Sequence, residues 1–212
     1  MTVVLLHAFP LDERMWEPQR AVVPNAVTPR LYGRGRAMDA WAESIAAEVE
    51  GELVLVGASM GGYCALALAR RAPERVRKVL LAGSRPDADS EERRERRAAT
   101  IDLIRSEGPE GLWRDMLPKL FADESHADER LLYRDPQGLV EAVEAIRDRA
   151  DSTEVARAFG DRIRFVVGEH DPFVSTDELR GFDVREIAGG HLVNLERPDE
   201  FNAQLQEFLA GV

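Results

Sequence analysis

The stretch Leu53-Val54-Leu55-Val56-Gly57-Ala58-Ser59-Met60-Gly61-Gly62 decides the fold, because it joins an apolar run to a glycine-rich turn and then to a helical pattern. An unbroken apolar run is typical of a parallel strand covered on both faces. The helical pattern predicts a helix over 60–72. The turn has the pattern G-x-S-x-G, in which Gly57 and Gly61 leave space around a serine in a strained backbone conformation. We therefore expect Ser59 to stand above the end of a strand.

Similar apolar runs alternate with helical patterns along the whole chain. Strands are expected at 3–6, 26–31, 53–56, 76–81, 163–167 and 184–187, and helices at 39–50, 60–72 and 198–209. The last of these helices is amphipathic, with Phe201, Leu205 and Phe208 on one face. This alternation predicts an α/β fold with a mostly parallel sheet of about six strands and helices on both faces.

Residues 85–160 interrupt the alternation, because they contain helical patterns without a convincing strand. The segment opens with a capping serine, Ser90, and an acidic first turn. It holds more apolar side chains than a solvated loop would: Ile101, Leu103, Ile104, Leu112, Met116, Leu117, Leu120 and Phe121. We expect a single domain whose core is 1–84 and 161–212 and whose residues 85–160 form an inserted helical cap, a lid over the sheet. The charged run 92–97 is interpreted as a solvated helix face, with Glu92 and Arg96 four residues apart.

Composition narrows the class of protein. The 212 residues include 28 Lys+Arg and 39 Asp+Glu, a formal charge of −11, with 44% hydrophobic residues and a single cysteine, Cys64. The length fits one globular domain, and the acidic balance argues against a nucleic-acid or anionic-membrane binder. No apolar run approaches the roughly 20 residues of a membrane helix, and the first residues lack the basic region of a signal peptide. A cytoplasmic protein is expected, and Cys64 is interpreted as a small buried hydrophobic residue.

Chemistry at Ser59 requires partners, because a serine hydroxyl is a weak nucleophile at neutral pH. His191 follows the last expected strand after two glycines, which let its loop turn back over the sheet edge. Asp171 follows the fifth expected strand and is the preferred residue to orient the imidazole. Three other carboxylates compete for that role: Glu169, Asp87 and Asp89. Ligands of open α/β sheets bind at the carboxyl ends of strands, where Ser59, Asp171 and His191 are all expected.

The order Ser59, Asp171, His191 resembles that of the α/β-hydrolase superfamily, and the resemblance extends over essentially the whole chain. The segments 190–198 and 116–121 look most like the small carboxylesterase and enol-lactonase branch. His7-Ala8-Phe9-Pro10 is similar to the His-Gly-x-Pro segment of the family, with Ala8 in place of the usual glycine. The resemblance implies that the backbone N–H groups of Phe9 and Met60 form an oxyanion hole and that His7 is structural. It also implies that the N-terminal β-hairpin common in the family is missing here.

The function implied by the resemblance is that of a serine hydrolase acting on a small-molecule carboxylic ester or lactone through an acyl-enzyme, without cofactor or metal. The implied substrate pocket contains Phe9, Leu192 and Met116. Thioester hydrolysis, C–C bond cleavage and a lyase step of menaquinone synthesis are alternatives on the same fold, as is a non-catalytic ligand-binding module. Three arginines near strand ends are candidates to pair with a substrate carboxylate: Arg34, Arg36 and Arg85. The sequence does not indicate the oligomeric state.

Overall fold

A single parallel sheet organises the molecule, as a computed structural model describing residues 1–210 shows. Its strands are β1 (Thr2–Leu6), β2 (Leu53–Ala58), β3 (Val76–Ala82), β4 (Ile163–Gly168) and β5 (Asp183–Ile187), and they lie side by side in sequence order. Every neighbouring pair is parallel. The predicted α/β fold is confirmed, and five of the six expected strands are present at the expected places.

The expected strand at 26–31 is wrong. Only Val27 pairs with the sheet, through one parallel bridge to Val4 on the free side of β1. The Val27 N–H donates to Val3 and the Val27 carbonyl accepts from Leu5, so the next donor in a parallel ladder would be residue 29. That residue is Pro29, which has no N–H. The ladder therefore ends after one residue, and the sheet described here has five strands.

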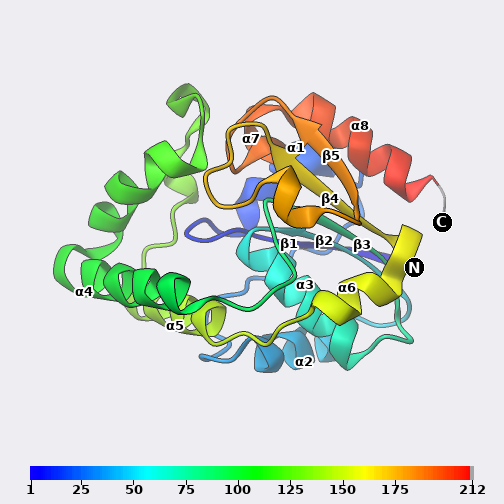
Figure 1. The fold of residues 1–212 in the computed structure, drawn as a ribbon, viewed down its shortest axis with the longest axis horizontal. Helices are drawn as coiled ribbons and strands as arrows, with labels where there is room; N and C mark the ends of the chain where they lie inside the picture. Colours follow the sequence, from blue (N-terminus) through cyan, green and yellow to red (C-terminus); the bar gives the residue numbers. More distant parts are fainter. Residues whose placement is uncertain (211–212) are drawn as a thin grey trace.

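Helices cover both faces of the sheet (Figure 1). On one face lie α2 (Met38–Glu48), α3 (Met60–Arg71) and α6 (Thr153–Phe159), and on the other α1 (Glu17–Arg20), α7 (Val193–Glu196) and α8 (Pro198–Leu209). The helices expected at 39–50, 60–72 and 198–209 are thus present. Short 3₁₀ turns complete the chain: η1 (Glu13–Trp16), η2 (Glu124–His126), η3 (Glu129–Leu131), η4 (Gly160–Arg162) and η5 (Thr176–Leu179).

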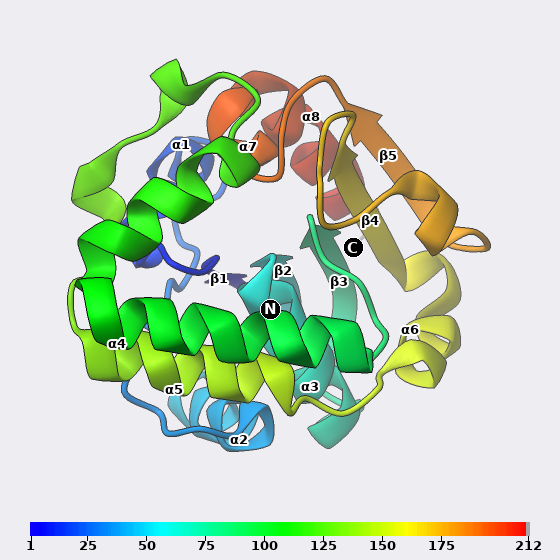
Figure 2. The same cartoon turned by 60° about the vertical axis from the view of Figure 1, so that its left-hand side comes forward.

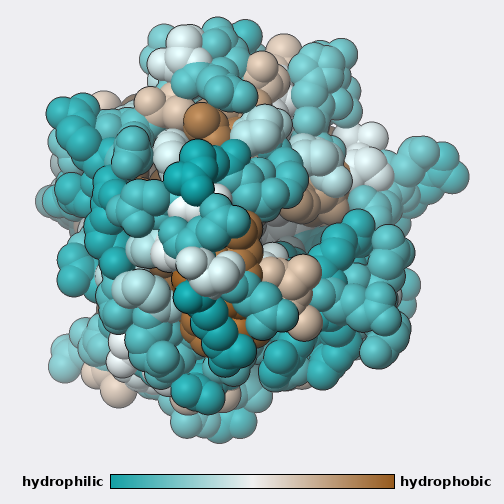
Figure 3. All heavy atoms as spheres, turned by 90° about the vertical axis from the view of Figure 1, so that its left-hand side faces the viewer, coloured by the Kyte–Doolittle hydropathy of each residue, from teal (hydrophilic) through white to brown (hydrophobic). Residues whose placement is uncertain are grey.

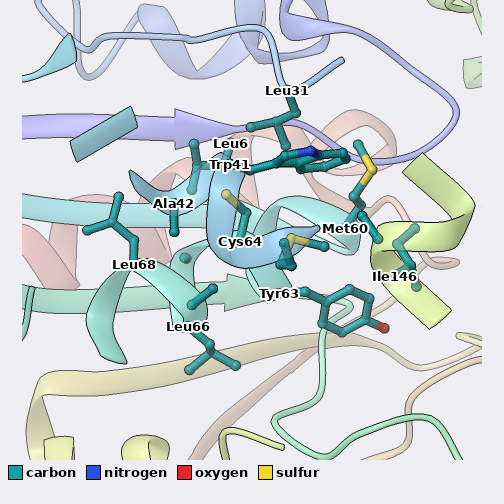
Figure 4. Packing of buried hydrophobic residues seen from close by; sticks show 14 of the residues in the cluster. Leu6, Leu31, Trp41, Ala42, Met60, Tyr63, Cys64, Leu66, Leu68 and Ile146 are labelled. Carbon is teal, nitrogen blue, oxygen red and sulfur yellow. The ribbon is translucent and has the colours of Figure 1, made fainter. Parts of the chain in front are cut away.

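The core between the sheet and α2 and α3 supports the start of α3 (Figure 4). Trp41 of α2 is fully buried beside Leu31 and Met60, and its indole N–H donates to the Gly35 carbonyl at 2.8 Å. Cys64 is also fully buried, and burial raises the pKa of its thiol to about 12. This side chain is therefore a packing residue, as the sequence indicated. Apolar contacts on both sides hold the first turn of α3 in place under Ser59.

The insertion between β3 and β4 contains two packed helices, α4 (Glu91–Leu120) and α5 (Pro136–Arg147), beyond the carboxyl ends of the strands (Figures 1 and 2). The Ser90 hydroxyl caps α4 by accepting the Arg93 N–H. At Gly108, whose φ is +69°, α4 breaks into two segments. The apolar residues expected to need cover are buried or half-buried. Cap boundaries at 85 and 160 stay a prediction, and no helix among residues 1–210 is long and apolar enough to cross a membrane.

Candidate active site

Ser59 occupies a strained turn between β2 and α3. Its φ of +49° and ψ of −112° are rare for a residue with a side chain, and conformations of this kind cost on the order of 1–3 kcal/mol. Glycine makes the turn possible on both sides. A Cβ on Gly57 would lie 2.5 Å from the Gly61 backbone, and a Cβ on Gly61 would lie 2.0 Å from the Leu6 carbonyl oxygen. The half-buried Ser59 is thus raised at the carboxyl edge of the sheet.

Gly83 and Ser84 directly follow β3 and contact the site, although the sequence did not indicate a role for either. The fully buried Ser84 hydroxyl lies 2.9 Å from the Ser59 carbonyl oxygen and 3.0 Å from that of Ala82. Gly83 has a φ of +54°, and a Cβ there would lie 2.9 Å from the His191 ring. A small pair, Gly-Ser, directly after a buried strand was the available signal in the sequence.

His191 and Asp171 form a buried pair. The distance from His191 Nδ1 to Asp171 Oδ2 is 2.8 Å, and the two side chains are 4% and 0% exposed. The other Asp171 oxygen, Oδ1, accepts the Phe173 and Val174 backbone N–H groups at 2.8 and 3.2 Å. An acceptor at Nδ1 favours the tautomer that leaves Nε2 free to take a proton. The Phe173 ring packs edge-on against the imidazole, with 4.7 Å between the two ring centroids.

The competing carboxylates lie elsewhere. Glu169 is exposed. Asp87 forms an ion pair with Arg85, and Asp89 forms one with Arg149. Of the four candidates, Asp171 is the one that contacts His191.

Ser59, His191 and Asp171 line one cavity of about 800 Å³. Phe9 and Met116 also line it, as expected for pocket residues. Leu192 does not, and this expectation is corrected: its side chain is 1% exposed and packs in the apolar cluster on the α8 side. The cap side of the molecule is mostly hydrophilic, with apolar atoms visible near its centre (Figure 3).

In the described part of the chain, residues 1–210, no hydrogen bond joins the Ser59 hydroxyl to His191. Such bonds are often long in enzymes without substrate and tighten when substrate binds. The serine and the imidazole share the cavity, and the Asp171–His191 bond is already formed.

Two backbone N–H groups near the cavity are open: that of Met60, which follows Ser59, and that of Phe9, which lines the same cavity as Ser59. Within the part of the chain described, neither Phe9 N nor Met60 N donates a hydrogen bond to the protein, whereas Ala8 N donates to Met15 Sδ at 3.1 Å. Met60 is the first residue of α3, where helix dipole and free N–H groups favour negative charge. These two donors suit an oxyanion.

His7 holds the segment that carries Phe9. Its Nε2 accepts the Leu31 N–H at 2.9 Å, and its Nδ1 lies 3.2 Å from the Ala8 carbonyl oxygen. Complete burial lowers the pKa of His7 to about 4, so the ring is neutral at pH 7. A neutral imidazole that bridges two loops is structural, as the resemblance implied.

Glu196 ties the His191 loop to the end of α4. Its buried carboxylate accepts three backbone N–H groups, from Gly190 at 2.5 Å, Ala122 at 3.0 Å and Asp123 at 2.9 Å. The Leu192 N–H also donates to the Leu120 carbonyl at 3.0 Å. Three hydrogen bonds therefore fix the segment 190–196 to the cap, and the Gly190–Glu196 bond closes the segment on itself.

Of the three arginines expected near the site, one lines the cavity. Arg34 pairs with Glu48 at 2.5 Å and Arg36 with Glu144 at 3.3 Å, and neither lines the cavity, so both are wrong as candidates there. Arg85 does line it. The run at 92–97 makes the expected Arg96–Glu92 contact at 3.5 Å, but this helix face borders the cavity and not only solvent.

A parallel α/β sheet with a strained serine turn, an aspartate–histidine pair and open N–H groups at one edge defines the class of α/β-fold hydrolases. The family model described as "Alpha/beta hydrolase family" matches residues 3–204, and the chain belongs to this family. It is an α/β-fold hydrolase.

Several known proteins are similar to this chain in sequence or in structure. A segment of 93 residues is 34% identical to the pimeloyl-[acyl-carrier protein] methyl ester esterase of Aromatoleum aromaticum, covering 40% of this chain and 37% of that protein. The structure of a thermophilic esterase from Thermogutta terrifontis, with malate bound, is 28% identical with a TM-score of 0.86, covering 100% of this chain and 90% of that one. The enol-lactonase of Burkholderia xenovorans LB400 is 24% identical with a TM-score of 0.79, covering 98% and 90%, and shows the shared fold.

Proposed function

We propose that this protein hydrolyses a small-molecule carboxylic ester or lactone through an acyl-enzyme on Ser59. The observation that carries the proposal is the buried 2.8 Å pair of His191 and Asp171 in the cavity that also exposes Ser59. Ester hydrolysis is favoured over other reactions of the fold by the esterases among the relatives, of which the Thermogutta terrifontis enzyme aligns over the whole chain.

In this mechanism Ser59 Oγ attacks the ester carbonyl and gives its proton to His191 Nε2. Asp171 keeps Nδ1 protonated and stabilises the imidazolium that forms. The Phe9 and Met60 N–H groups donate to the oxygen of the tetrahedral intermediate. His191 then returns the proton to the alcohol as it leaves, and a water activated by the same imidazole hydrolyses the acyl-enzyme. No step requires a cofactor.

Hydrolysis of p-nitrophenyl acetate tests this proposal. Ser59→Ala is expected to lower kcat by on the order of 10⁴-fold or more, because the three residues act as a unit. Ser106→Ala is a matched control, since this exposed serine on α4 bonds only to backbone carbonyls of its own helix. Equal activity in wild type and Ser59→Ala would exclude Ser59 as the nucleophile. A folded wild type without any turnover would favour the thioesterase, C–C hydrolase or lyase alternatives.

A further inference from the structure

The first turns of α4 present cationic side chains to the cavity that contains Ser59. Arg93 and Arg97 are one turn apart and both line the cavity, as does the more exposed Arg96. Leu103, two turns further along α4, continues the same wall with an apolar side chain, and Phe173 lies beside His191. The cavity therefore has a charged part and an apolar part.

Ion pairs hold the cationic side chains of this part in place. The Asp89 side chain is 0% exposed and faces three guanidinium groups, those of Arg149 at 2.7 Å, Arg97 at 3.0 Å and Arg93 at 3.5 Å. Asp87 pairs with Arg85 at 2.6 Å and with Arg93 at 2.5 Å, and Glu178 pairs with Arg85 at 2.9 Å. Four arginines thus share three carboxylates in one network of ion pairs.

Asp87, which links two of these arginines, is ionised at neutral pH. Arginine does not lose its proton in proteins. Burial opposes ionisation of Asp87, but hydrogen bonds from Arg85 and Arg93 outweigh burial and lower its pKa. The neighbouring Asp151 is engaged by the backbone N–H groups of Ala88 and Thr153 and makes no ion pair within residues 1–210.

Arg97 is fixed at one end and open at the other. Its Nε donates to Asp89 at 3.0 Å, whereas its two terminal nitrogens have no hydrogen-bond partner in the part of the chain described. The side chain is 27% exposed and lines the cavity. A guanidinium held in this way loses little conformational entropy when it binds a planar anion, and carboxylate matches its donor geometry.

We propose that Arg97, with Arg93 and Arg96 beside it, binds a carboxylate that the substrate carries away from its ester carbonyl. The inference rests on the proposed function, since Ser59 supplies the reacting end of the cavity. The substrate class is then a monoester of a dicarboxylic acid or an ester of a hydroxy acid. The apolar wall at Leu103 and Phe173 would cover the chain between the two ends.

Two matched pairs of esters test the proposal. Monomethyl adipate against methyl hexanoate varies the charge on the acyl side, and 6-acetoxyhexanoate against hexyl acetate varies it on the alcohol side. In the wild type, one pair is expected to show at least a 10-fold higher kcat/KM for the charged ester. Arg97→Gln should lower that preference, measured as the ratio of the charged to the neutral ester within the variant, by a factor of about 10 to 100, as expected for a charged hydrogen bond. No preference in either pair, or a preference that Arg97→Gln leaves intact, overturns the proposal.

Arg105→Gln is the matched control, because this exposed arginine of α4 pairs with Asp102 and does not line the cavity. It removes the same charge and should leave both ratios unchanged. Arg96→Gln is a second variant that leaves Asp89 fully paired, so its smaller loss of preference does not depend on folding of the Arg97 variant.

Calorimetric binding of adipate separates this inference from the catalytic one. Binding to wild type that is weakened at least 10-fold in Arg97→Gln supports the carboxylate site even if no ester is hydrolysed. Turnover of neutral esters combined with no binding of adipate retains the hydrolase and overturns the carboxylate site.

Discussion

Gly83→Ala should lower the activity of the enzyme by displacing His191. The glycine follows β3 with a φ of +54°, and an added Cβ would lie 2.9 Å from His191 Cε1, Nδ1 and the carbonyl oxygen. Normal contact requires about 3.4 Å or more, so the imidazole must move by roughly half an ångström or more. A shift of about 1 Å at a reacting group costs on the order of 10²-fold in rate. We expect kcat to fall by roughly 10- to 100-fold.

Gly160→Ala is the matched control for backbone strain. Gly160 has a φ of +56°, and no atom lies within 4 Å of the position of its Cβ. Both variants should lose about 1–3 kcal/mol of stability from the positive φ, and for a chain of this size each kcal/mol lowers Tm by about 2–4 °C. The assay is kcat for p-nitrophenyl acetate together with thermal unfolding. Similar activity losses in both variants, or full activity in Gly83→Ala, would refute the reasoning.

Three further predictions concern single residues. Asp171→Asn should fold normally and lose on the order of 10³- to 10⁴-fold in kcat, because the amide favours the wrong His191 tautomer; a kcat within 10-fold of wild type contradicts this. Glu196→Gln should lower the free energy of unfolding by about 1–3 kcal/mol, because the amide replaces one of the two oxygens that accept the three backbone N–H groups. The variant should also lower kcat more than it raises KM. An effect on stability alone would limit the role of Glu196 to folding. His7 should make stability depend on pH, since its pKa is about 4 in the folded state and 6.5 in the unfolded state. Between these two values only the unfolded state gains the proton, so the free energy of unfolding should fall by about 2 kcal/mol from pH 7 to pH 5. Urea unfolding should show this loss in wild type and not in His7→Gln.

The sequence was most informative where the local pattern and the tertiary environment agree. The run 53–56 is apolar throughout because β2 is buried on both faces, so pattern and structure match. The run 26–31 is less apolar, since Thr28, Pro29 and Arg30 interrupt it, and Pro29 removes the donor that a second ladder position needs. A propensity for strand does not reveal where along a run the ladder ends.

The candidate site was predictable to the same degree. The carboxyl ends of parallel strands meet at one edge, so Ser59, Asp171 and His191 could be grouped from strand order alone. Leu192 could not be excluded from the pocket, because the direction of a side chain in an irregular loop depends on packing that only the fold defines.

The charged run at 92–97 shows the same limit. A helix with Glu92 and Arg96 four residues apart looks solvated from its sequence, yet the direction of α4 turns Arg93 and Arg97 toward the cavity. Asp89, which anchors Arg97, lies eight residues away in sequence and before the helix begins. Only the tertiary structure brings this cluster to the site.

Intact-mass spectrometry after incubation with a fluorophosphonate tests the central claim most directly, because it detects an activated serine without knowledge of the substrate. We predict one adduct on wild type, none on Ser59→Ala, and labelling slowed by orders of magnitude on His191→Ala. A folded wild type that takes no adduct, or an adduct that persists on Ser59→Ala, would contradict the assignment of Ser59 as the nucleophile.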